Sequence, residues 1–105
     1  MHFIKPIGLT DKSLILDVRT AEEHACAKLE LPHINKNLAE LDPLDFIREN
    51  NISDDETINI LCSSGARASQ AAEMFEEVGF SNVAVIIGGI VEAEYEGMHI
   101  VRRSN

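Results

Sequence analysis

Cys62-Ser-Ser-Gly-Ala-Arg67 is the stretch that decides the fold. It follows the short apolar run 57–61, which predicts a buried strand, and it opens into the helical pattern of residues 68–78. Cys62 therefore lies where a strand ends and a helix begins. Unpaired backbone N–H groups and the positive end of the helix dipole favour an anion at that place. They favour the thiolate, which is the reactive form of cysteine.

The charges near this loop also indicate an anion site. No acidic residue occurs between positions 61 and 72, although the chain holds 18 Asp+Glu against 9 Lys+Arg. The only charge in that interval is Arg67 in the first helical turn, and acids follow in the later turns. A helix that is stabilised by its own charges has the opposite arrangement. The pattern predicts a helix N-terminus that stays positive for a bound anion.

Each residue type in the loop suits this chemistry. Gly65 allows backbone conformations that other residues avoid, so that several N–H groups can point inward. Serine hydroxyls can donate to a thiolate or an oxyanion, and an arginine offers a planar fork of donors. The candidate site consists of Cys62 as nucleophile and a substrate-binding loop of Ser63, Ser64, Gly65, Ala66 and Arg67.

Strand and helix patterns alternate along the chain with short connections. This predicts an α/β fold with a mostly parallel, four- to five-stranded sheet and helices on both faces. Strands are predicted at 13–18, around Ile34, at 57–61 and at 83–87, with an edge strand around Phe3-Ile4. Helices are predicted from a Thr20–Glu23 capping box to about Lys28, from Asp42-Pro43 to about Asn50, from 68 to 78 before Gly79, and over 90–95.

Composition narrows the functional classes. The 105 residues fit one domain, 1–105, and 45% hydrophobic residues suffice for a core. The net charge of −9 opposes binding to nucleic acid or to an anionic membrane. The sequence starts without the pattern of a signal peptide, which predicts a cytoplasmic protein with no membrane partner.

The remaining candidate residues receive structural interpretations. Cys26 and Cys62 are expected to be free thiols, with Cys26 packed in the core. Asp17 and Arg19 are interpreted as a structural pair at a strand end. The histidines are scattered and show no ligand spacing with either cysteine, so no metal site is indicated.

Three segments together resemble the rhodanese-like sulfurtransferases. Their active loop has the form Cys-x-x-Gly-x-Arg, as in 62–67 here. The segment 16–20 with Glu22-Glu23 is similar to the family's Asp-x-Arg strand end and following helix, and 88–90 with 97–101 is similar to its closing Gly-Gly segment. The resemblance spans residues 14–101. It implies a rhodanese-like fold and an enzyme without a cofactor.

The resemblance also implies a reaction. Cys62 would take sulfane sulfur from thiosulfate, polysulfide or a persulfide, hold it as a persulfide, and pass it to cyanide or a thiol, including a protein thiol. Ser63 stands where the family often has a basic residue, so the loop has one fixed positive charge. This departure puts efficient use of the thiosulfate dianion in doubt. The sequence leaves the physiological donor, the acceptor and the oligomeric state open.

Two other functions remain as alternatives. A non-catalytic rhodanese module would bind a protein partner, although such modules often lack the cysteine that this chain keeps. A cysteine-based phosphatase or arsenate reductase uses the same cradle but typically holds one more residue between cysteine and arginine than the four found here.

Overall fold

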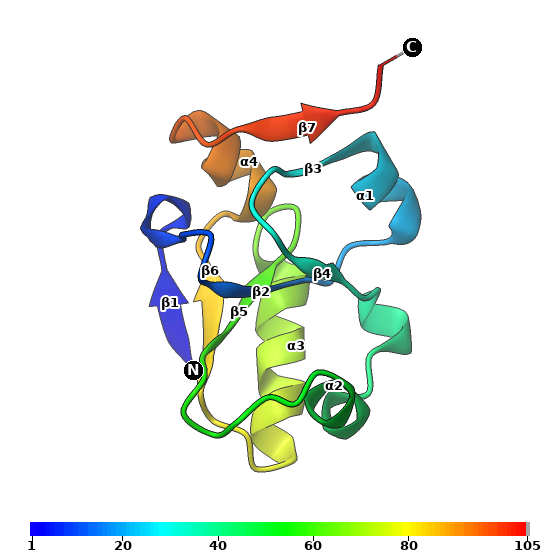
Figure 1. Ribbon diagram of the computed structural model, residues 1–105, viewed down its shortest axis with the longest axis vertical. Helices are drawn as coiled ribbons and strands as arrows, with labels where there is room; N and C mark the ends of the chain where they lie inside the picture. The colour runs from blue at the N-terminus through cyan, green and yellow to red at the C-terminus, as the bar shows by residue number, and fades with distance from the viewer. Residues whose placement is uncertain (105) are drawn as a thin grey trace.

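A five-stranded parallel sheet forms the centre of the protein, with the strand order β1-β6-β5-β2-β4 (Figure 1). The computed structural model describes residues 1–104. The strands of this sheet are β1 (His2–Ile4), β2 (Leu14–Asp17), β4 (Ile34–Asn35), β5 (Ile58–Leu61) and β6 (Val83–Ile86). The predicted α/β class and parallel sheet are confirmed.

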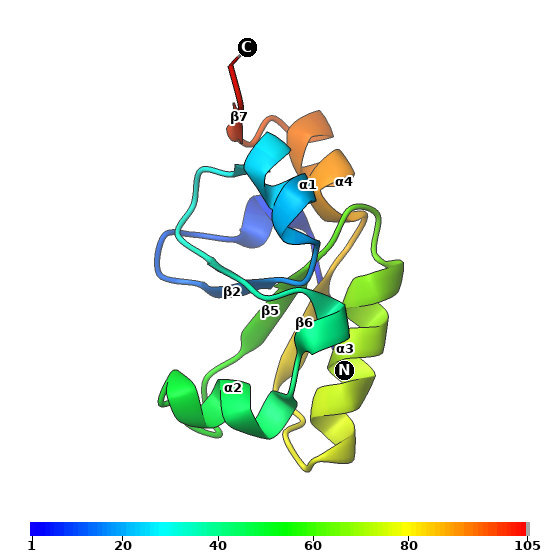
Figure 2. The same ribbon diagram turned by 90° about the vertical axis from the view of Figure 1, so that its right-hand side faces the viewer.

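Helices cover both faces of the sheet, as predicted. The α-helices are α1 (Ala21–Cys26), α2 (Pro43–Glu49), α3 (Ala66–Glu77) and α4 (Gly89–Tyr95), and two short 3₁₀ helices are η1 (Pro6–Gly8) and η2 (Leu38–Glu40). Helices α2 and α3 lie on one face (Figure 2). No helix within residues 1–104 has the length and hydrophobicity that a membrane crossing requires.

Alternate residues of the central strands supply two hydrophobic cores. Leu16 and Ile60 point into the core under α2 and α3, together with Phe75. Their neighbours Ile15 and Leu61 point into the other core, which includes Ala93 of α4. Strands buried on both faces read as continuous apolar runs, which is why the sequence predicted them well.

Local signals also set the ends of the helices. At the start of α1, the Glu23 amide donates to Thr20 Oγ1 at 3.1 Å and the Thr20 amide donates to Glu23 Oε1 at 3.0 Å, which confirms the capping box. Asp42 caps α2, with Pro43 in its first turn. The chain turns back after α3, where the Phe80 amide donates to the Phe75 carbonyl at 3.0 Å. These elements form where short-range chemistry requires them.

A second sheet of two antiparallel strands corrects the predicted extent of the first helix. Helix α1 ends at Cys26, and β3 (Ala27–Leu29) pairs with β7 (Ile100–Arg102), so Lys28 lies in a strand. Lys28 is opposite Val101 in this pairing. Strand β7 lies near the C-terminal end of the sequence, so no local pattern around β3 predicts this pairing. The sheet packs over the second core through Leu29 and Ile100.

Candidate active site

The loop after β5 brings Cys62 to the carboxyl end of the sheet, where α3 begins. Gly65 is the N-cap residue of α3, with φ +119°, a conformation that glycine adopts without strain. It makes no side-chain cap hydrogen bond, and the first turn of α3 contains no acid. The amides of that turn therefore have no side-chain acceptor from the cap, as the strand-to-helix position of the loop predicted.

One of the loop amides faces the sulfur. The Gly65 N–H donates to Cys62 Sγ at 2.9 Å. A hydrogen bond from a backbone amide stabilises a thiolate more than a thiol. Cys62 is also only 1% exposed and belongs to the core under α3. The loop thus combines the predicted amide contact with a sulfur that is covered by its surroundings.

Arg67 is paired with an acid from a distant part of the chain. Its Nη1 and Nη2 atoms lie 2.7 and 2.9 Å from the two carboxylate oxygens of Glu23, 44 positions away. Nη2 also donates to Ser63 Oγ at 3.1 Å, and that hydroxyl lies 3.1 Å from Glu23 Oε2. The sequence around the loop contains no acid, but the folded site does, because α1 supplies the Glu23 carboxylate as the counter-charge of Arg67.

The pairing changes the electrostatics of both partners. The Arg67 guanidinium holds the pKa of the Glu23 carboxyl well below its usual range, and burial opposes this only in part. The Glu23 carboxylate in turn raises the pKa of Arg67. Both side chains stay charged throughout the neutral pH range. An incoming anion would compete with Glu23 for the arginine.

The other two predicted loop residues, Ser64 and Ala66, are exposed. They belong to the loop but are not part of the hydrogen-bonded cluster of Glu23, Ser63 and Arg67.

The first residues of α4 form backbone hydrogen bonds with the loop. The Ile90 amide donates to the Cys62 carbonyl at 2.9 Å, and the Val91 amide donates to the Ser63 carbonyl at 3.3 Å. Gly89, the residue before Ile90, has φ +60°, and a Cβ atom there would be 2.3 Å from the Cys62 carbonyl oxygen. Only glycine allows this approach of two backbones. The Gly-Gly segment is thus a structural part of the site.

Asp17 and Arg19 hold α1 over the loop. The Arg19 guanidinium makes a salt bridge of 2.9 Å to Asp17, with both side chains at most 3% exposed. Arg19 Nη2 also donates to the Ala27 carbonyl at 2.7 Å, just beyond the last turn of α1. The predicted structural pair is confirmed. It positions the helix that carries Glu23.

Cys26 does not pack in the core, and that expectation is wrong. Both cysteines are free, as predicted, but Cys26 is exposed. Arg103 Nη2 lies 3.3 Å from its sulfur, at the edge of the β3–β7 sheet. Because α1 ends at Cys26, the side chain falls outside both cores.

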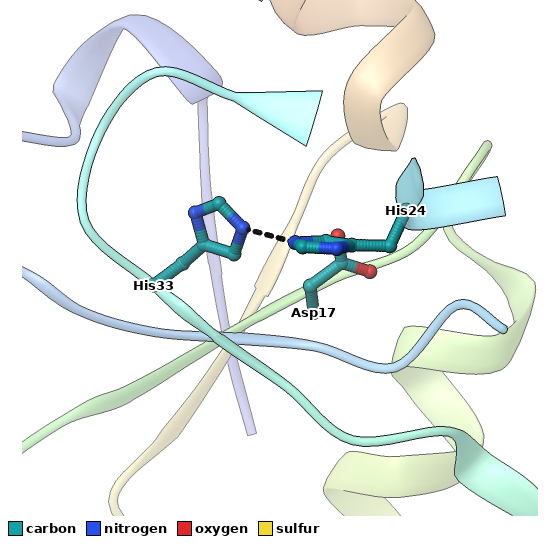
Figure 3. Close-up of side chains that lie close together, drawn as sticks. All are labelled: Asp17, His24 and His33. Carbon is teal, nitrogen blue, oxygen red and sulfur yellow. Dashed lines mark hydrogen bonds between the residues drawn. The ribbon is translucent and has the colours of Figure 1, made fainter. Parts of the chain in front are cut away.

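Two histidines that the sequence left scattered lie together in the structure. The Nε2 atoms of His24 and His33 are 2.7 Å apart, close to the carboxylate of Asp17 (Figure 3). Burial and the neighbouring His33 ring lower the pKa of His24. Their separation by nine residues across a strand and a turn matches no ligand motif, so no sequence signal marks the pair.

Comparison with known proteins gives one family. The model of the rhodanese-like domain matches residues 5–96. The solved structure of SSP1007 from Staphylococcus saprophyticus is 28% identical, with a TM-score of 0.73 over 94% of this chain and 99% of that one. No curated protein matches the sequence.

Two further solved structures share the fold. A rhodanese with anions from E. coli is 24% identical, with a TM-score of 0.68 over 87% of this chain and 99% of its own. A rhodanese-like domain protein from Staphylococcus aureus is also 24% identical, with a TM-score of 0.68 over 99% of this chain and all of its own.

Proposed function

This chain belongs to the rhodanese-like domain family, and from that membership we propose that it is a sulfurtransferase that carries sulfane sulfur on Cys62. The observation that supports the proposal most directly is the contact between the Gly65 amide and Cys62 Sγ at the start of α3. An amide held in that place stabilises negative charge on the thiolate without moving during the reaction. The proposed reaction uses only groups of the protein itself and requires no cofactor.

The proposed reaction has two displacement steps. The Cys62 thiolate attacks the outer sulfur of a donor such as thiosulfate, and a new S–S bond forms while the donor's S–S bond breaks. Sulfite leaves with the electron pair. In the second step, cyanide or a thiolate attacks the terminal sulfur of the Cys62 persulfide, giving thiocyanate or a new persulfide and regenerating the thiolate. The cycle needs no external oxidant or reductant.

Mass spectrometry tests the first step. We expect that thiosulfate, polysulfide or glutathione persulfide, each mixed separately with the protein, adds the mass of one sulfur atom to the peptide that contains Cys62. Cyanide should then remove this mass and yield an equal amount of thiocyanate. Because Cys62 is 1% exposed, a donor must displace part of the surrounding structure to react, so slow formation of the adduct is compatible with the proposal.

The opposite outcome would favour a binding module. If no donor modifies Cys62 on prolonged incubation, while the exposed Cys26 reacts with the same donors, the burial of Cys62 reflects a packing role. The protein would then serve as a non-catalytic member of the family.

The charge of Glu23 is proposed to determine which donors react. A carboxylate paired to Arg67 repels a dianion such as thiosulfate from the loop. We expect Glu23→Gln to increase the rate with thiosulfate, relative to the rate with the persulfide of 2-mercaptoethanol, which has no carboxylate, by about fivefold, the effect of removing one charge a few ångströms away. Glutamine also closes capping boxes, so the start of α1 should be preserved.

Glu22→Gln is the matched control, because Glu22 is the exposed neighbour in the first turn of α1. Glu22→Gln removes the same formal charge as Glu23→Gln. Its effect on the ratio of the two rates should nevertheless be small, because the Glu22 side chain is exposed to solvent. Equal ratios in both variants would show that Glu23 does not select the donor.

A further inference from the structure

We propose that His24 and His33 form a binding site for a divalent transition metal ion such as Zn²⁺, with Asp17 as the third ligand. The site is distinct from the sulfur loop and does not depend on sulfur transfer. His24 comes from α1, His33 precedes β4, and Asp17 ends β2. Their potential ligand atoms all lie within 4.8 Å of one another (Figure 3).

The imidazole rings of His24 and His33 approach each other through their Nε2 atoms. The Nε2 atoms are 2.7 Å apart, and the rings meet edge to face. At this distance one nitrogen donates a proton to the other, and a metal ion that replaced this proton could be ligated by both. Imidazole nitrogen is a preferred ligand of Zn²⁺, Cu²⁺ and Ni²⁺.

The surroundings of His33 prepare its Nε2 atom as a ligand. His33 Nδ1 lies 2.7 Å from the Leu31 carbonyl oxygen, which can only accept a hydrogen bond. Nδ1 therefore carries the proton of the neutral ring, and Nε2 presents a free electron pair toward His24. Metal-binding histidines commonly have this arrangement, in which the second ring nitrogen donates to a carbonyl.

Asp17 supplies the negative charge of the site. Its side chain is fully buried, and both of its oxygens accept hydrogen bonds from Arg19, through the backbone amide and the guanidinium. In tetrahedral coordination, neighbouring ligand atoms are roughly 3.3 Å apart. The two histidine nitrogens must therefore open by about half an ångström, and the carboxylate must approach by as much as about 1.5 Å. A water molecule would complete the coordination.

Metal titration of the full chain tests this proposal. After treatment with a chelator, the protein should bind one equivalent of Zn²⁺ by calorimetry, and Co²⁺ should give the visible absorption of a tetrahedral nitrogen and oxygen site. We expect His24→Gln and His33→Gln each to weaken Zn²⁺ binding by at least about tenfold. His99→Gln is the control, because His99 is an exposed histidine that faces Glu30.

The results separate the proposal from its rivals. Absence of saturable binding up to roughly 100 µM Zn²⁺ would overturn it. So would binding that survives both histidine variants, or binding that is lost in Cys26→Ser together with a thiolate-to-cobalt absorption band. If a histidine variant fails to fold, the ring resonances of His24 and His33 in the unchanged protein must shift when Zn²⁺ is added, and unshifted resonances would contradict the proposal.

Discussion

Replacement of Cys62 by serine is expected to abolish sulfur transfer, with a loss of more than about a thousandfold in rate. A serine hydroxyl stays protonated at neutral pH and forms no persulfide, so both displacement steps lose their nucleophile. The two side chains differ by one atom, and the core around this position should tolerate the change. The formation of thiocyanate from cyanide and each sulfane donor measures the effect.

Cys26→Ser provides the comparison for this result. Cys26 is the other free thiol and is exposed, so it is the obvious site for unspecific chemistry with sulfane donors. We expect this variant to keep the full transfer rate. Transfer that persists in Cys62→Ser but is lost in Cys26→Ser would assign the chemistry to Cys26 and end the proposed mechanism.

The second large effect is expected from Gly89→Ala. A methyl group there would lie 2.3 Å from the Cys62 carbonyl oxygen and 2.5 Å from the Ser63 carbonyl oxygen. Both carbonyls accept hydrogen bonds from the start of α4, so the loop cannot move away without losing them. An alanine at this position would also be strained by its positive φ. We therefore expect the free energy of unfolding, measured in denaturant, to fall by about 2–4 kcal/mol. Sulfur transfer should fall as well, because the loop geometry is lost.

Gly79→Ala separates strain from contact. Gly79 also has a positive φ, +91°, but a Cβ atom there would meet nothing within 4 Å. Its substitution should destabilise the protein by only about 1–2 kcal/mol and leave the transfer rate unchanged. If the two variants behave alike in both measurements, the close approach of α4 to the loop has no energetic importance.

The parts of the fold that were predictable are those that short-range chemistry determines. The apolar run before Cys62 became β5, the capping box at Thr20 started α1, and the segment 88–90 opened α4. Each is encoded by neighbouring residues, so a pattern in the sequence was sufficient. The β3–β7 pairing joins residues more than seventy positions apart, and it shortened α1 and left Cys26 at the surface.

The position of the candidate site could be predicted from the sequence, but the pairing of its arginine with an acid could not. The loop of residues 62–67 has its expected place between β5 and α3. Its partner Glu23 was assigned only to a capping box, because the reach of α1 over the loop depends on the buried contacts of Arg19. The approach of His24 and His33 has the same origin. Contacts between side chains of different elements can be predicted only when the order of the strands in the sheet is known.

The double engagement of Glu23 has a consequence for how this protein tolerates change. One carboxylate accepts a hydrogen bond from the Thr20 amide at the start of α1 and also pairs with Arg67 at the start of α3. Mutations in these two helices are therefore epistatic through a single side chain. A variant that loosens one helix alters the electrostatic environment of the other, even though the two segments are not neighbours in the sequence.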